Sequence, residues 1–312
     1  MRLHRARLVV TLGFAGFLGF LLWATAGFMH SAFAGSVLQV PRDFRTIQAA
    51  VDAASPGDIV QVAPGTYAEN LLVMTQDIIL HGVDATLDGT GLGGNGIHVL
   101  DTNGVVIIGF VVENFENGIV LQNVDDSKVH LNELRNNVSP QDVGPMTRNG
   151  ILLDNAHGNL ITNNHTHDNG HNGITLLGAS SNNTFRANRS VNNGTDVAEF
   201  LGGCGLQTFG PNNDNNVIVA NEFLGGDVQG WGILIGDDGE SSGNFIAQNR
   251  SHGQHRAGIA MVASASGNFI QQNNAQGNGL ANTDPSFHFD LWDEDGAATD
   301  NTWKRNQGTS NF

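Results

Sequence analysis

A column of charged and polar residues, each placed directly after a repeated asparagine, is the first candidate for chemistry. The repeat reads Asn, any residue, aliphatic or aromatic, two of any kind, Asn. The residues that follow its second Asn are Glu133, His165, Arg189, Glu222, Arg250 and Asn274. Histidine is the commonest general base, and a neighbouring arginine can neutralise an anion. The alternative is a solvent-exposed ladder of alternating charge, which stabilises its neighbours only modestly.

Histidines near this column suggest a metal site as a second hypothesis. His165, His167 and Asp168 lie within one short stretch, and His252 with His255 forms a second group. The two groups cannot share an ion, because His167 and His252 fall three repeats apart, about 14 Å at the spacing of paired strands. A local site of His165, His167 and Asp168 stays open, against the alternative of solvated turn histidines.

Two acidic groups suggest Ca²⁺, which takes six to eight oxygen ligands. They are Asp237, Asp238 and Glu240, and Asp293, Glu294 and Asp295. Neither group has the fixed ligand spacing of a calcium loop. Ca²⁺ therefore stays a possible cofactor, the alternative is solvated turns, and no metal ligand is assigned.

Two phrases recur along the chain and must position these residues. The first, a small residue followed by Gly and an aliphatic residue, has its glycines at positions 96, 118, 150, 173, 205, 232 and 258. The second is the Asn repeat, with the pairs Asn159/Asn164, Asn183/Asn188, Asn216/Asn221, Asn244/Asn249, Asn268/Asn273 and Asn301/Asn306, and Ser127/Asn132 as a variant. A fixed spacing within each unit indicates a repeat architecture.

Each unit holds two or three short strands between Gly and Asn turns, which leaves no room for a crossover helix. The chain must therefore coil, with the strands of each coil pairing with those of the next about 4.8 Å away. Units of 22 to 24 residues make one coil, and units of 32 carry an added loop. We expect the turn asparagines to stack inward and bond along the axis, where stacked carboxylates would repel.

These phrases, Asn-Gly-Ile-x-Leu and Asn-x-Ile-x-x-Asn, resemble the repeat of the pectate-lyase-like superfamily over about residues 40–306. The resemblance implies an all-β fold, a single-stranded right-handed parallel β-helix (solenoid). The segment from Phe44 to Tyr67 is similar to the short N-terminal capping helix and first strand of such solenoids, which gives a capping region of about 40–75. A cap is needed because an open end exposes core and unpaired strand edge.

The superfamily also implies chemistry on uronic-acid polysaccharides. Its lyases and epimerases neutralise the uronate with cations and remove the C5 proton with a base, which implies His165 and Arg189 as catalytic residues. Glu133 and Glu222 would orient them. Hydrolysis would need two carboxylates about 5 to 9.5 Å apart, and with this many acids such pairs arise by chance. An esterase is disfavoured, because the chain has no Leu-Gly-Arg-Pro-Trp motif.

Three insertions, at about 137–148, 193–203 and 277–286, follow the same turn of the repeat, so we expect them to wall a lateral groove. Its flanks would carry Arg148, Asp196, Glu199 and Asp284, and its floor Thr175 and Gln207. Arg250, Arg148 and Gln207 are the predicted substrate-binding residues. Insertions that collect on a tolerant turn without any ligand are the alternative.

The N-terminus predicts export. Arg2, Arg5 and Arg7 precede an apolar run, and Ala32-Phe33-Ala34 supplies small residues for cleavage after Ala34. Residues 1–34 are therefore expected to be a signal peptide, with an uncleaved membrane anchor as the alternative, and residues 35–312 the β-helix domain of a secreted or periplasmic protein. Cys204 is the single cysteine, so no intrachain disulfide forms.

Charge limits the partners. The chain has 30 acidic and 14 basic residues, and removal of residues 1–34 takes away three arginines, which leaves 11 bases and a net charge of −19. This balance argues against nucleic acid, since affinity for phosphates comes from Lys and Arg. It also disfavours simple capture of anionic chains unless a local basic patch or Ca²⁺ intervenes. We expect a monomer.

Three classes of function stay open: a polysaccharide lyase or C5-epimerase, a polysaccharide-binding module without turnover, and a non-catalytic envelope scaffold. The scaffold reading rests on resemblance to the periplasmic β-helix accessory protein of nitrous-oxide reductase (NosD-like). Copper delivery by such a protein is weakened here, because residues 35–312 offer only Met74, Met146, Met261 and Cys204 as sulfur ligands.

Overall fold

The computed structural model describes residues 35–138, 146–195, 203–226, 228–262, 264–280, 289–294 and 300–312. The predicted signal or anchor at residues 1–34 lies outside them, as do Asp196, Glu199, Asp284 and Asp295. Within the described ranges, no helix is long and apolar enough to cross a membrane.

Strands dominate the described structure and form two long sheets and a short one. The eighteen-stranded sheet holds β1 (Val37–Val40), β2 (Ile59–Val62), β3 (Gly65–Tyr67), β5 (Ile79–Asp88), β7 (Val106–Glu113), β9 (Lys128–His130), β10 (Glu133–Arg135), β12 (Leu160–Thr162), β13 (His165–His167), β15 (Thr184–Arg186), β16 (Arg189–Val191), β18 (Val217–Val219), β19 (Glu222–Leu224), β22 (Phe245–Ala247), β23 (Arg250–His252), β26 (Phe269–Gln271), β27 (Asn274–Ala275) and β29 (Thr302–Lys304). The nine-stranded sheet holds β4 (Leu71–Val73), β6 (Asn95–Asn103), β8 (Asn117–Asp125), β11 (Ile151–Asp154), β14 (Ile174–Leu177), β17 (Cys204–Phe209), β20 (Trp231–Asp237), β24 (Ile259–Met261) and β28 (Leu291–Asp293). β21 (Ser241–Ser242) pairs with β25 (Ala265–Ser266).

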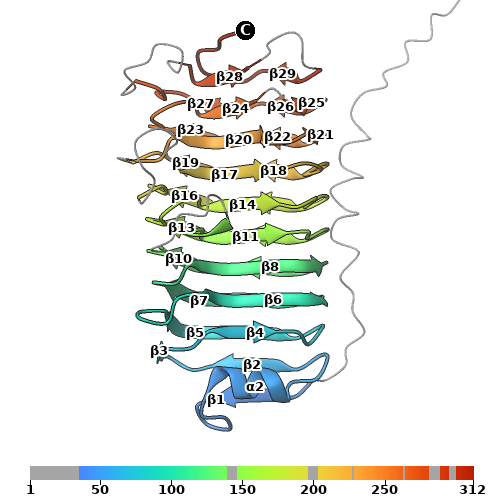
Figure 1. Cartoon of the computed structure of the whole chain (residues 1–312), viewed down its shortest axis with the longest axis vertical. Coiled ribbons are helices and arrows are strands. Elements are labelled where there is room, and N and C mark those ends of the chain that lie inside the picture. Colours follow the sequence, from blue (N-terminus) through green and yellow to red (C-terminus); the bar gives the residue numbers. More distant parts are fainter. Residues whose placement is uncertain are drawn as a thin grey trace, which may run out of the picture. The chain divides into compact units, whose positions relative to one another are not determined.

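The strands stack in parallel, each coil on the next, as Figure 1 shows from the blue N-terminal coil to the red C-terminal one. Along the nine-stranded sheet the aliphatic residue of the Gly phrase stays in register. Ile119 pairs with Ile151, Ile151 with Ile174 and Ile174 with Leu206. The paired residues are 32 or 23 positions apart in the sequence, so the additional residues of the longer units lie between strands and leave the register unchanged. The all-β, right-handed parallel β-helix predicted from the repeat is confirmed.

The glycines of that phrase are required by close packing between coils. A Cβ added at Gly150 would lie 2.7 Å from the carbonyl oxygen of Gly173 and 2.9 Å from Cγ2 of Thr166. At Gly118 it would lie 2.6 Å from the carbonyl oxygen of Gly150. Each glycine therefore allows its neighbouring coil to approach, and the aliphatic residue after it fills the core.

The predicted asparagine ladders run through the turns as buried columns. Asn164 is typical: its Oδ1 accepts the backbone N–H of Asn132 at 3.0 Å, and its Nδ2 donates to the carbonyl of Val129 at 2.9 Å and to Oδ1 of Asn188 at 3.1 Å. Only an amide offers both the donor and the acceptor. A third column, which the repeat phrases did not predict, consists of Asn137, Asn169, Asn193, Gln229, Gln254, Asn278 and Asp290.

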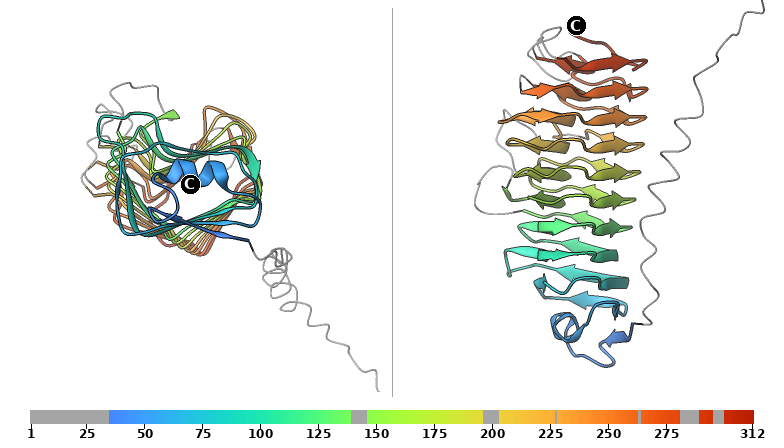
Figure 2. Two further views of the ribbon diagram at one scale, coloured as in Figure 1. Left: turned by 90° about the horizontal axis from the view of Figure 1, so that it is seen from below. Right: turned by 90° about the vertical axis from the view of Figure 1, so that its right-hand side faces the viewer.

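A short helix, α2 (Ile47–Ala53), covers the N-terminal end of the stack, where the sequence predicted a cap (Figure 2). Thr46 accepts the N–H of Ala49, and the carboxylate of Glu69 accepts the N–H groups of Ile47 and Gln48. Negative charge at a helix N-terminus is favourable. The helix buries an apolar face on the first coil, which closes the core.

The three insertions lie between corresponding strands. They join β10 to β11, β16 to β17 and β27 to β28, so each leads from the eighteen-stranded sheet into the nine-stranded one. The prediction that they follow one turn of the repeat is therefore correct.

Candidate functional sites

The predicted column is brought together on the outer face of the eighteen-stranded sheet. Glu133 pairs with His165, His165 with Arg189, Arg189 with Glu222, and Glu222 with Arg250, each from the next coil. Asn274 follows Arg250. The register inferred from the second Asn of the repeat is thus correct, and five titratable side chains lie on successive coils.

His165 and Arg189 form the central contact of the column. Nη1 of Arg189 lies 2.8 Å from Nε2 of His165. Arginine has only donors, so Nε2 accepts, and the ring is the neutral form with its proton on Nδ1. Burial lowers the pKa of His165 below its ordinary value of 6.5, and the neighbouring His167 and Arg189 lower it further. His165 is therefore a neutral imidazole at neutral pH.

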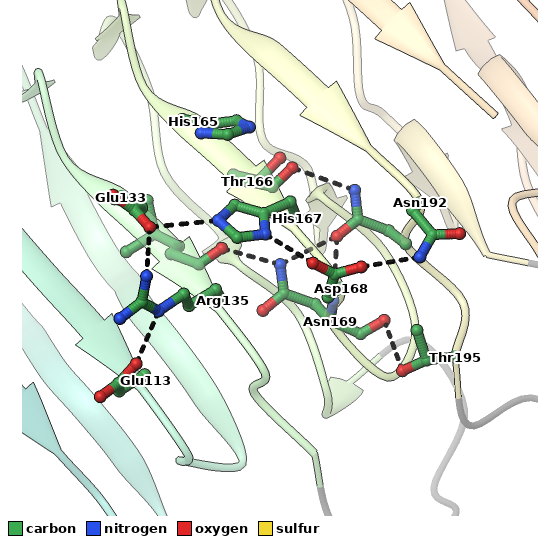
Figure 3. Close-up of polar contacts among 12 residues, drawn as sticks. Glu113, Glu133, Arg135, His165, Thr166, His167, Asp168, Asn169, Asn192 and Thr195 are labelled. Atoms are coloured by element: carbon green, nitrogen blue, oxygen red, sulfur yellow. Dashed lines mark hydrogen bonds and ion pairs between the residues drawn. The ribbon is translucent and has the colours of Figure 1, made fainter. Parts of the chain in front are cut away.

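His167 fixes the position of His165 from beneath. The two rings stack with centroids 4.4 Å apart, and His167 bonds through Nε2 to Glu133 at 3.2 Å and through Nδ1 to Asp168 at 2.7 Å (Figure 3). Asp168 also accepts Nδ2 of Asn192 at 2.7 Å. Burial raises the pKa of Asp168, but these bonds outweigh it and hold the pKa below its usual value. Carboxylates on both nitrogens thus set the His167 ring plane.

Ion pairs join the rest of the column. Arg135 bridges Glu113 at 2.6 Å and Glu133 at 2.7 Å. Glu222 accepts Nε of Arg189 at 3.1 Å and Nη1 of Arg250 at 3.0 Å. The Arg189 and Arg250 side chains are 46% and 60% exposed, so both cations remain accessible to a ligand in solvent.

The other two predicted substrate-binding residues are placed differently. Arg148 is only 2% exposed, and Gln207 only 4%. Oε1 of Gln207 accepts Nδ2 of Asn172, and its Nε2 donates to Asp237, so the amide is used within the protein. Thr175, the other predicted floor residue, is fully buried. Thr175 and Gln207 lie at outward positions of β14 and β17, and Arg148 lies in the segment before β11. All three side chains are covered by other parts of the protein.

A groove does exist on the outer face of the nine-stranded sheet, on coils closer to the N-terminus than predicted. Its volume is about 450 Å³, and its lining includes Val120, Leu152, Leu177 and Phe209. Sequence reasoning missed these residues. The available signal was that the outward positions of β8, β11 and β14, expected to be polar, carry aliphatic side chains.

The described residues do not assemble a metal site: they hold no group of three or more His, Cys, Asp or Glu arranged for an ion. The sulfur ligands are scattered. Cys204 is buried, and burial raises the pKa of its thiol well above the usual value, which opposes the thiolate that metals bind. Met261 lies in the core, whereas Met74 and Met146 are exposed. The donors of the described residues therefore do not fit a copper site.

The acidic side chains considered for Ca²⁺ differ in burial and in their bonding partners. Asp293 is buried and accepts Nε1 of Trp303 at 3.0 Å. Burial raises the pKa of Asp237, and the bond from Gln207 only partly offsets this. Asp238 and Glu240 are exposed. Asp237 and Asp293 are therefore engaged in bonds within the protein.

A comparison with known protein families identifies the family of the chain. Residues 66–231, more than half of it, match the model of the family described as periplasmic copper-binding protein (NosD). The sequence has no significant match among curated proteins. The solved structures that resemble it have different activities, and at their low identity they show the fold alone.

Three such structures are representative. The periplasmic alginate epimerase AlgG, as its D317A mutant, is 17% identical with a TM-score of 0.52, over 87% of this chain and 54% of that one. An alginate lyase from Paenibacillus sp. str. FPU-7 is 15% identical with a TM-score of 0.54, over 89% and 99%. The Dettilon tailspike protein is 14% identical with a TM-score of 0.59, over 77% and 50%. The chain thus spans about half the length of the epimerase and the tailspike.

The stacked parallel coils define a parallel β-helix protein, and its fold resembles that of an alginate epimerase and an alginate lyase. Within that class, the family match identifies the family because it covers more than half of the chain. The chain belongs to the family of periplasmic copper-binding proteins (NosD).

Proposed function

We propose that this protein binds a uronate-containing polysaccharide outside the cytoplasm and acts on it as a lyase or C5-epimerase at the His165–Arg189 pair. The family's description as periplasmic supports the location. The fold shared with an alginate epimerase and an alginate lyase supports the substrate class. Export through a signal peptide at residues 1–34 is part of the proposal.

The contact between His165 and Arg189 carries the proposal. A uronate carboxylate would compete with His165 for the guanidinium of Arg189, since a charged acceptor binds it more strongly than a neutral nitrogen. The lone pair on Nε2 of His165 would then be released beside the bound sugar. Substrate binding thus exposes the base that removes the C5 proton, and the base is already neutral. The electron pair of the broken C5–H bond would move onto the carboxylate that Arg189 neutralises. In a lyase it would then expel the C4 oxygen, which takes a proton from solvent, and in an epimerase C5 would take a proton back on the opposite face.

The neighbouring residues would support this exchange. Glu133 holds His167, which stacks on His165, and Glu222 holds Arg189 through Nε while Nη1 turns to the substrate. Arg250, two coils beyond Arg189, would bind a second carboxylate about 10 Å away at the strand spacing. Because Arg148 and Gln207 are buried, we propose that they act by supporting the coils instead of touching the sugar.

The column is preferred over the groove for a uronate because of its charge. Arg189 and Arg250 are accessible cations, whereas the groove lining includes Glu116 and Asp154. Copper, which the family description names, has no part in the proposal, because the described residues include no group of three or more His, Cys, Asp or Glu side chains that could hold a metal ion. Ca²⁺ is proposed only as an ion that could bridge substrate carboxylates to the protein's acids.

A non-catalytic scaffold is the second candidate. The observation that favours it is the mutual pairing of the column's charges: Arg135 with Glu113 and Glu133, and Glu222 with Arg189 and Arg250. Such a ladder stabilises neighbouring coils without any ligand. This reading expects no glycan retention and no turnover.

The deciding experiment follows two reaction products on alginate and pectate, with and without EDTA: the unsaturated sugar of a lyase, by its absorbance, and the sugar deuterated at C5 in D₂O that an epimerase forms, by NMR. Retention on the same immobilised polymers is measured in parallel. We expect product from the native protein and none from His165→Ala or Arg189→Ala, with His81→Ala as a matched control on the same sheet. Retention without product would support a binding module, and neither signal would support the scaffold.

A further inference from the structure

From β12 to β27, each coil places two short strands in the eighteen-stranded sheet, and an exposed turn residue follows the first of them (Figure 1). We call this row of turn residues the corner, and it consists of Asn163, Ala187, Ala220, Gln248 and Gln272, with Arg305 in the equivalent place after β29. The first five members carry no charge. The corner is thus an uncharged edge that runs along the coils beside the His165–Arg189 pair.

Lysine and arginine recur at every second coil of this sheet. Among its described strands they occur in β9 and β10, in β15 and β16, in β23 and in β29. The strands of the coils between them, β12 and β13, β18 and β19, and β26 and β27, have neither. Pairing fixes this order, since β15 is followed by β18, β22, β26 and β29. The positive charges therefore repeat every two coils.

The cations of the last three groups border the corner and are exposed. They are Arg186 and Arg189, then Arg250, then Lys304 with Arg305. Two strand steps lead from Arg189 to Arg250, and two more lead from Arg250 to the coil of Arg305. Two steps cover about 10 Å at the spacing of paired strands. A stiff polyanion with that charge repeat would meet a cation at each repeat.

Three of these cations have no counter-ion. Glu222 pairs with Arg189 and Arg250. In the described part of the chain, no ion pair involves Arg186, Lys304 or Arg305. Their charges are therefore available to a ligand.

Acids are scarce on this surface. Glu222 is the one acid in the described strands of the sheet from β12 to β29. Asp214 and Asp300 precede β18 and β29, so they lie at the opposite strand ends from the corner. In a chain with 30 acids and 14 bases, this edge is an exception that attracts anions.

The aromatic residues beside the corner do not offer a stacking platform. The rings of Phe245 and Phe269 lie parallel with centroids 5.9 Å apart, and Nζ of Lys304 lies 4.9 Å from the centroid of Phe269. The faces of Phe269 are therefore covered from both neighbouring coils. Recognition of a neutral sugar by ring stacking is disfavoured here, and recognition by charge is favoured.

We propose that the substrate lies along the corner, parallel to the stack of coils, and that it is an extended polyuronate whose sugars are joined equatorially. The inference rests on the uronate substrate proposed for the His165–Arg189 pair. In such a chain each sugar is turned by half a turn from the last, so carboxylates on one side recur every second sugar, roughly 10 Å by ordinary single-bond lengths. This repeat matches that of Arg189, Arg250 and Arg305. Arg186 and Lys304 attract the chain from the other side of the corner.

The test is calorimetric titration of full-length His165→Ala, which lacks the base, with a mannuronate hexamer, whose sugars are joined equatorially. The matched ligand is a guluronate hexamer, which has the same charge but axial linkages and a shorter repeat. We expect at least tenfold tighter binding of the mannuronate hexamer. A mannuronate trimer should also bind at least tenfold more weakly, because it cannot span the four coil spacings, about 19 Å, from Arg189 to Arg305.

Variants identify the surface. Arg186→Gln and Lys304→Gln, each made in His165→Ala, should weaken binding of the mannuronate hexamer about threefold to tenfold, and added salt should weaken it further. Arg45→Gln, which removes an exposed cation just before α2, should leave binding unchanged. Thermal unfolding of each variant checks that it folds.

Several results would overturn the proposal. Equal affinity for the guluronate hexamer would remove the match of repeats, and equal affinity for hexaglutamate would make the edge a general polyanion surface. Unchanged hexamer affinity in folded Arg186→Gln and Lys304→Gln, or no binding at all, would also refute it. Loss of the C5 proton of alginate with the native protein, without this dependence on linkage, refutes the present inference alone. Linkage-dependent binding without loss of that proton refutes the proposed chemistry alone.

Discussion

At the scale of single residues, the environment of His165 explains what its type alone could not. The sequence predicted that it lies beside Arg189, but the contact of Nε2 with the guanidinium and the stacking on His167 are seen only in the folded structure. Burial, more than any single charge, makes it a neutral base. The burial of Arg148 and Gln207 could not be predicted for the same reason, because it depends on which other segments cover them, and the register of the repeat does not show this.

The pH dependence of activity should follow His165. Because its folded pKa lies below 6.5, the neutral base persists at pH values somewhat below 6.5, and activity should fall only as the pH drops through the lowered pKa. A profile of initial rate against pH on alginate checks this. An acidic limb centred above 6.5 would contradict the assignment.

The same shift predicts a stability change. The unfolded chain takes up a proton at His165 before the folded protein does, so its contribution to the free energy of unfolding is complete above about 6.5 and declines as pH falls through the folded pKa. Urea unfolding at two pH values should show a smaller pH dependence for His165→Ala than for the native protein. If the free energy of unfolding had the same pH dependence in His165→Ala and in the native protein, the lowered pKa of His165 would be contradicted.

Buried ladder asparagines should be costly to remove. Asn164→Ala leaves the N–H of Asn132 and the carbonyl of Val129 without their partner, which should lower the free energy of unfolding by about 3 kcal/mol. Asn103→Ala, an exposed asparagine at the end of β6, is the control and should cost less than about 0.5 kcal/mol. Chemical denaturation of both variants measures the difference.

At the scale of elements, much of the structure was readable from the sequence. The Gly phrase gave the strands of the nine-stranded sheet, and the second Asn gave the register of the charged column, because both depend on contacts repeated in every coil. The position of the groove could not be predicted from the sequence. Its base depends on aliphatic residues at outward positions, which a pattern of inward periodicity does not mark.

The glycine of each coil should tolerate no side chain. Gly150→Ala would bring a Cβ to 2.7 Å from the carbonyl oxygen of Gly173, so the coils must separate locally. We expect a loss of about 2 kcal/mol in unfolding free energy, as for an overpacked core. A variant as stable as the native protein would contradict this account of close packing between neighbouring coils.

At the scale of the whole molecule, the local distribution of charge reconciles the strong acidity of the chain with the proposed polysaccharide partner. Residues 35–312 carry 11 bases and 30 acids, yet Arg189 and Arg250 lie together on one exposed face. The groove, whose lining includes Glu116 and Asp154, is acidic like the chain as a whole. Repetition allows this separation, because each face of a coil can be altered without changing the core column that holds the stack.

The central claim is that His165 removes the C5 proton of a bound uronate. Its most direct test is the loss of the C5 proton signal of alginate in D₂O, followed by NMR, since lyase and epimerase chemistry both break that bond. We predict loss of the signal with the native protein and its full retention with His165→Ala and Arg189→Ala. Retention of the signal with the native protein, or equal loss with His165→Ala, would contradict the account.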